Sequence, residues 1–138
     1  MCLIDEVVNW SPAEIRCRAA SHRLSSNPLR TVDGLRSECG IEYAAQAIAI
    51  HGALIAARRG APVAAGMLAS VRRVALRVSR LDDIVADLMV RATHISGDAT
   101  AQLYDFSIAG ELQTLLTGRA TIVLRQPSVT RASAGSHT

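Results

Sequence analysis

The chain has 138 residues, of which 49% are hydrophobic and 20% charged, and its mean hydropathy is +0.22. This composition fits one domain with a hydrophobic core and excludes a largely disordered chain, because disordered segments are apolar-poor and strongly charged. The odd number of cysteines and their lack of metal-ligand spacing predict reduced thiols, no metal site and a cytoplasmic location. No signal-peptide pattern opens the sequence, since Asp5 and Glu6 come almost at once.

The formal charge is +3, and all 15 basic residues are arginine. Nucleic-acid binding is not expected, because base stacking relies on aromatic side chains and the chain has few of them: Trp10, Tyr43, Tyr104 and Phe106. A mildly positive surface instead favours an acidic macromolecular partner.

The first half of the chain predicts one dominant element. Residues 14–20 are a possible strand, and residues 21–38 form a polar loop. Residues 39–59 predict a long Ala-rich helix that stops before Gly60 and Pro62. Apolar residues surround this helix on nearly all sides, so we expect it to be buried all round. A membrane span is the rival interpretation, and the polar side chains inside the segment argue against it: Glu42, Gln46 and His51.

The second half changes to a period of two, which is typical of strands. The alternating runs cover residues 74–79, 84–93, 103–108 and 119–124. Short turns separate these runs and predict antiparallel neighbours. We expect residues 1–125 to form a single domain and residues 126–138 to be a disordered tail.

One buried helix with about five or six antiparallel strands predicts an α+β hotdog fold, in which a curved sheet wraps around the central helix. Because such a sheet covers the helix incompletely, pairing with a second copy is expected.

Polar residues on the helix are the first candidates for chemistry. A carboxylate at Glu42, in an apolar helix, is costly unless it is paired, protonated or functional, or it simply favours the helix N-terminus electrostatically. Gln46 lies one turn later on the same face. His51 is nine residues past Glu42, hence on the opposite side, and is interpreted as a core or interface histidine.

Two further histidines differ in their setting. His94 is in phase with apolar strand residues and is interpreted as structural, whereas His22 lies in the polar loop, where catalytic groups are often found. No phosphate loop, zinc spacing or nucleophile elbow appears, so neither a cofactor nor a covalent nucleophile is predicted, although Cys39 at the helix start is a possible reactive thiol.

The run Gly-Ile-Glu-Tyr-Ala-Ala-Gln-Ala resembles the central-helix motif of hotdog 3-hydroxyacyl-carrier-protein dehydratases. The stretch from Ser21 to Arg30 is similar to the branch associated with aryl-polyene lipid biosynthesis. The resemblance covers roughly residues 1–125, and its motifs are Leu3–Val7, Ser21–Arg30, Gly40–Ala47, Tyr104–Phe106 and Gly118–Thr121.

The resemblance implies roles for five residues. Glu42 matches the acidic residue of the helix, Gln46 the glutamine after it and Gly40 the glycine before it. His22 is the best match to the catalytic histidine, although the His-Phe-Pro-Gly motif of the main dehydratases is absent. Ser37 stands where the family has a glycine whose amide binds the thioester carbonyl. His22 would be the base at C2, and Glu42 would protonate or orient the leaving hydroxyl.

The implied reaction is dehydration of a 3-hydroxyacyl-carrier-protein thioester to the trans-2-enoyl thioester. Two alternatives stay open: a hotdog acyl-thioesterase, and a non-catalytic subunit that supports an active hotdog partner. The implied partners are an acidic carrier protein, docked near Arg72 and Arg73, and a second hotdog chain, in a homodimer or a heterodimer. The acyl channel would run between the helices of the two subunits.

Overall fold

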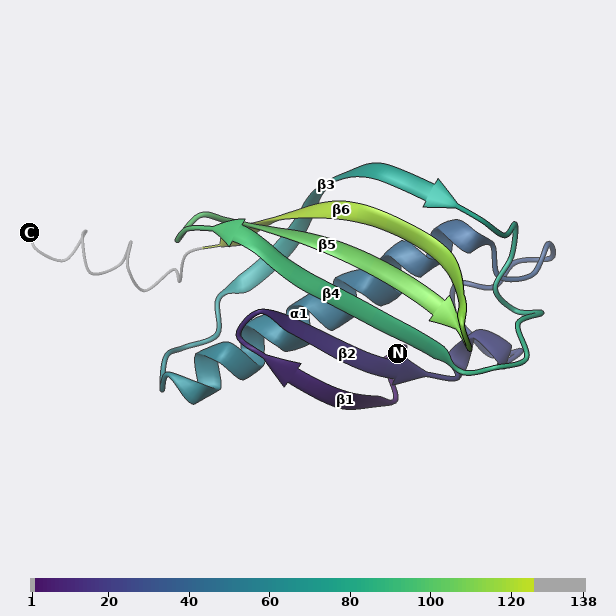
Figure 1. The fold of residues 1–138 in the computed structure, drawn as a ribbon, viewed down its shortest axis with the longest axis horizontal. Coiled ribbons are helices and arrows are strands. Elements are labelled where there is room, and N and C mark those ends of the chain that lie inside the picture. The colour runs from purple at the N-terminus through teal and green to yellow at the C-terminus, as the bar shows by residue number, and fades with distance from the viewer. Residues whose placement is uncertain (1, 126–138) are drawn as a thin grey trace, which may run out of the picture.

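The computed structural model describes residues 2–125 and has one helix and six strands, so the tail predicted over residues 126–138 lies outside it. The strands form one antiparallel sheet in the order β1-β2-β4-β5-β6-β3, and Figure 1 shows this curved sheet lying across the helix. The arrangement confirms the predicted hotdog fold. The elements in chain order are β1 (Glu6–Ser11), β2 (Glu14–Ala19), the 3-10 turns η1 (Ser21–Arg23) and η2 (Ser37–Cys39), α1 (Gly40–Arg58), β3 (Ala65–Leu76), β4 (Leu88–Gly97), β5 (Ala101–Gly110) and β6 (Gln113–Arg125).

The strands deviate most from the prediction at β3. This strand begins at Ala65, well before the alternating run, and ends at Leu76, so Val78 lies outside it. Its first residues carry no alternating pattern, and they are extended because they pair with β6, with Ala65 opposite Arg125. The sequence analysis also missed β1, none of whose residues is fully buried and which is held by pairing with β2.

The helix buries one face and not all of its surface. Its buried residues recur at helical spacing and pack on the sheet: Gly40, Tyr43, Ala44, Ala47, Ile48 and His51. Glu42, Ala49 and Gly52 are exposed on the other side, which corrects the expectation of burial all round. Alanines cover both faces, so apolarity alone could not distinguish them. The segment Ser37–Arg58 is long and apolar enough to cross a membrane, but its packing is that of a core helix.

β3 forms one edge of the sheet, where it pairs only with β6. Several of its large apolar side chains are exposed, namely Met67, Val74 and Leu76. A long edge strand with such residues leaves a row of backbone groups and an apolar surface open to a second chain.

Candidate active site

His22 lies in η1, directly after β2, and its side chain is fully buried. Its Nε2 lies 3.0 Å from the carbonyl oxygen of Ile84. Because a carbonyl only accepts, Nε2 carries the hydrogen and the neutral ring has its lone pair on Nδ1. Nδ1 is buried and has no hydrogen-bond partner among residues 2–125. Burial also lowers the pKa of His22, so the ring is a neutral base at pH 7.

A buried polar network docks the His22 loop onto α1. The Ser21 hydroxyl donates to the carbonyl oxygen of Leu3 (2.8 Å) and lies 2.7 Å from the Tyr43 hydroxyl. The side-chain amide of Asn27 donates both to that hydroxyl (3.0 Å) and to the carbonyl oxygen of Ser21 (2.9 Å). These contacts fix the residue next to His22. Sequence reasoning missed the network, because the tyrosine and the asparagine show no local pattern that joins them.

Glu42 occupies the first turn of α1 and is exposed in the single chain. The expectation that the helix is buried all round is therefore wrong at Glu42 in the single chain. Within the described part of the chain, no hydrogen bond joins Glu42 to His22, since Nε2 of the histidine is used by Ile84 and Nδ1 has no partner. The two predicted acid–base residues thus form no pair within one subunit: His22 is buried and Glu42 is exposed.

The other three predicted site residues surround the start of α1. Gln46 accepts a hydrogen bond of 2.7 Å from the amide of Leu3 and so anchors the N-terminal segment. A Cβ on Gly40 would lie 2.7 Å from a methyl of Leu116, so glycine permits the close approach of the helix to the sheet. The amide of Ser37 donates to Ser79, whereas its buried hydroxyl has no hydrogen-bond partner among the described residues.

No side chain caps the start of α1, and the Gly40 amide donates to the carbonyl oxygen of Ser37 in η2, so the positive end of the helix dipole lies beside Ser37. Cys39, at the N-cap position, is half-buried, and burial raises the pKa of its thiol. The thiol is therefore protonated at pH 7, which does not favour a cysteine nucleophile. Between Cys2 and Arg125, no three His, Cys, Asp or Glu side chains are arranged to hold a metal ion.

A groove of about 800 Å³ runs beside the exposed face of α1. It begins at Ala45, one turn beyond Glu42, and continues past Ala49 and Gly52 between the helix and the sheet residues Leu68 and Ile122. Such an apolar groove has the shape and chemistry for an extended hydrocarbon chain.

Of the two histidines interpreted as structural, His94 lines this groove, and His51 contacts Tyr104, another lining residue. His51 is fully buried, with Nδ1 2.6 Å from the Tyr104 hydroxyl and Nε2 2.7 Å from the carbonyl oxygen of Ser11. The side chain of His94 is hydrogen-bonded to Gln102 and packs edge-on against the Tyr104 ring. The interpretation of both histidines as structural fits these contacts.

Several arginines are exposed on and after β3 and just before η2. Arg72 and Arg73 are exposed on β3, and Arg77 follows the strand. Arg36 is also exposed and precedes Ser37, whose amide bonds to Ser79. The positive φ of 56° at Arg73 marks a bulge that interrupts the pairing of β3 with β6.

Comparison with known proteins identifies relatives of the whole chain. The family model described as ApeP dehydratase matches residues 1–134. No curated protein matches the chain significantly. Among solved structures, the dehydratase heterocomplex ApeI:P from Xenorhabdus doucetiae has a TM-score of 0.82 at 22% identity, over 96% of this chain and 88% of that one. A thioesterase from Haemophilus influenzae has a TM-score of 0.63 at 12% identity, over 88% of this chain and 78% of that one. At these identities the structures show the shared fold.

Proposed function

Because the chain belongs to the ApeP-like family of dehydratases, we propose that its substrate is a 3-hydroxyacyl thioester on an acyl carrier protein, which it converts to the trans-2-enoyl thioester. The observation that carries this proposal is the state of His22, a neutral buried imidazole whose Nδ1 lone pair has no hydrogen-bond partner among the described residues. A base of this kind is what removal of a C2 proton requires.

The reaction needs two proton transfers and one developing negative charge. His22 Nδ1 takes the proton from C2, the C–H electron pair forms the new double bond, and the C3–O bond breaks. Glu42 gives a proton to the departing oxygen, which leaves as water. The hydroxyl of Ser37 and the positive end of the helix dipole of α1 stabilise the thioester oxygen as it becomes enolate-like.

A complete site requires two hotdog chains. His22 is buried in its loop, and Glu42 points out from the open face of α1, so a second chain is needed to bring a carboxylate to the imidazole. The free edge of β3 and the open helix face are the surfaces for that second chain. A heterodimer with another hotdog subunit is the alternative to a homodimer, and it is supported by the similarity to a chain of a dehydratase heterocomplex.

The groove and the arginines fit the two parts of such a substrate. The groove beyond Glu42 takes the acyl chain, and exposed arginines on and after β3 and before η2 attract an acidic carrier protein: Arg36, Arg72, Arg73 and Arg77. The free thiols of the chain fit a cytoplasmic reaction, where such carriers would be met. Thioesterase activity is the second candidate, because a helix carboxylate such as Glu42 can also activate water, and solved thioesterases share the fold.

A mixing experiment tests the shared site. His22→Ala and Glu42→Gln homodimers should each be nearly inactive, whereas co-expression gives mixed dimers in which one site is intact. Random pairing makes about half of the dimers mixed, each with one working site, so about a quarter of the wild-type turnover should return. If mixed dimers are present by mass spectrometry and no activity returns, the two-chain site is wrong.

A further inference from the structure

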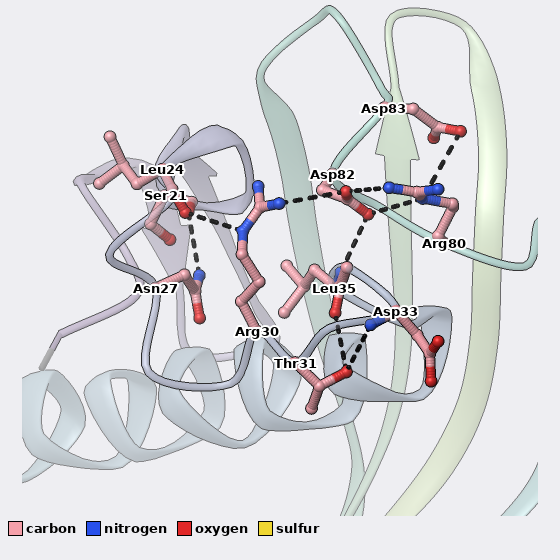
Figure 2. Close-up of polar contacts among 11 residues, drawn as sticks. Ser21, Leu24, Asn27, Arg30, Thr31, Asp33, Leu35, Arg80, Asp82 and Asp83 are labelled. Carbon is pink, nitrogen blue, oxygen red and sulfur yellow. Dashed lines mark hydrogen bonds and ion pairs between the residues drawn. The ribbon is translucent and has the colours of Figure 1, made fainter.

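Asp82 lies in the connection between β3 and β4, and its side chain is only 5% exposed. Figure 2 shows its carboxylate at the centre of a polar cluster. Oδ1 accepts from Arg80 Nε at 3.0 Å and from the amide of Leu35 at 3.0 Å, while Oδ2 accepts from the Arg80 guanidinium and from Arg30 Nη1 at 3.3 Å. A buried carboxylate with two guanidinium partners and an amide is fully ionised, and these partners hold the pKa of Asp82 well below its usual range.

Hydrogen bonds connect this cluster to the start of α1 through residues 35–37. The amide of Leu81 donates to Leu35 (2.7 Å), and the amide of Ser37 donates to Ser79 (3.0 Å), so residues 35–37 and 79–81 form a short antiparallel ladder. Asp82 closes this ladder through its bond to the Leu35 amide. The position of Ser37 therefore depends on the Asp82 carboxylate.

The turn that contains Asp82 connects the cluster to His22 through Ile84. The amide of Ile84 donates to the carbonyl oxygen of Leu81 (3.0 Å), which closes a turn with Asp82 inside it. The carbonyl oxygen of Ile84 is the group that accepts from His22 Nε2. Asp82 is thus part of the turn that presents this carbonyl, and its carboxylate ties that turn to Leu35.

A second path joins Asp82 to the His22 loop through Arg30. The Nε of Arg30 donates to the carbonyl oxygen of Leu24 (3.3 Å), and the amide of Leu24 donates to the carbonyl oxygen of Ser21 (3.1 Å). Gly34 makes room for the cluster: its φ is +87°, and a Cβ there would lie 2.7 Å from Oδ2 of Asp82.

We infer that Asp82 is a positioning residue, which keeps His22 in the tautomer with the hydrogen on Nε2 and holds Ser37 at the start of α1. The inference rests on the proposed roles of His22 and Ser37. Asp82 acts through geometry. The guanidinium groups of Arg30 and Arg80 and the Leu35 amide hold its carboxylate, and the carboxylate holds the two segments that carry the Ile84 carbonyl and Ser37. When these segments drift, the imidazole loses the acceptor that selects its tautomer.

The test compares Asp82→Asn with Asp83→Asn as a matched control. The Asp83 side chain is 61% exposed, and its carboxylate comes no closer than 4.0 Å to the Arg80 guanidinium. Side-chain ¹⁵N NMR reports the His22 tautomer, and turnover against pH reports its titration. The charged groups that act on His22 are Arg23, on its own element, and Asp87, from the segment before β4, and neither is altered.

In Asp82→Asn we expect the Nδ1–H tautomer to become populated and kcat to fall about tenfold to a hundredfold, with KM changed less. In the profile of turnover against pH, the apparent pKa of the acid limb should rise toward about 6.5, the value of an unperturbed histidine, because water reaches the ring. Asp83→Asn should match the wild type in every measurement.

Arg30→Gln is the milder second variant, because it leaves the Arg80 pair intact, and it should move the tautomer and the acid limb in the same direction by less. A lower melting temperature with an unchanged tautomer and an unchanged acid limb in both variants would overturn the inference. The NMR measurement does not depend on turnover. If His22→Ala keeps full activity, the proposed role of His22 as the base fails even where Asp82→Asn shifts the tautomer.

Discussion

Glu42 and His51 lie on opposite sides of α1: the carboxylate is exposed in the single chain, whereas the imidazole is fully buried and bonded to Tyr104 and Ser11. One side of the helix therefore holds the fold together and the other side is available for chemistry and for a second chain. This division decides which substitutions on α1 affect stability and which affect turnover.

Glu42→Gln should leave the fold intact and abolish most of the activity. Its side chain is exposed, so the free energy of unfolding should change by no more than about 0.5 kcal/mol. Turnover should fall about a hundredfold or more, which is the usual loss for a positioned acid–base group. Glu38→Gln, an exposed carboxylate in η2, is the matched control and should keep wild-type turnover. Full activity in Glu42→Gln, measured on chains of unchanged melting temperature, would remove this residue from the mechanism.

Acid should destabilise the protein through its buried histidines. Burial lowers the pKa of His22 and of His51 in the folded chain, so below about pH 6.5 the unfolded chain binds protons that the folded chain does not. The free energy of unfolding should therefore fall as pH drops from 7 to 5, by at most about 1.4 kcal/mol per pH unit for each histidine. Urea denaturation measures this slope. It should be shallower in His51→Gln, and a slope unchanged by that substitution would exclude His51 as a source.

Tyr43→Phe should loosen the His22 loop. The substitution removes the hydroxyl that contacts both Ser21 and Asn27 in a buried site, at a cost of about 1–2 kcal/mol. Hydrogen exchange of the Leu24 amide, which donates to Ser21, should become faster. Tyr104→Phe is the matched control, because it also removes a buried hydroxyl but touches His51 instead of the loop. Equal exchange at Leu24 in both variants would show that Tyr43 does not hold the loop.

The sequence predicted the helix well, because an Ala-rich segment followed by Gly60 and Pro62 is a strong local signal, and its expected span of 39–59 differs little from Gly40–Arg58. The start of β3 was missed because its residues are extended only through pairing with β6. Local patterns also gave no sign that Asp82 contacts Arg30 and Leu35, which lie far from it in the chain. The exposure of Glu42 could not be predicted either, since alanines on both faces of α1 hide which one meets the sheet.

Product analysis is the most direct test of the central claim that this dehydratase acts on carrier-bound 3-hydroxyacyl thioesters. The purified protein, alone and with a hotdog partner subunit, is incubated with a 3-hydroxyacyl-carrier-protein and separately with the trans-2-enoyl form, and the carrier is analysed by mass spectrometry. We predict a loss of 18 Da from the first and a gain of 18 Da by the second, about the mass of one water, with little free thiol released. Free acid and unloaded carrier as the main products would contradict the account and assign the site to a thioesterase.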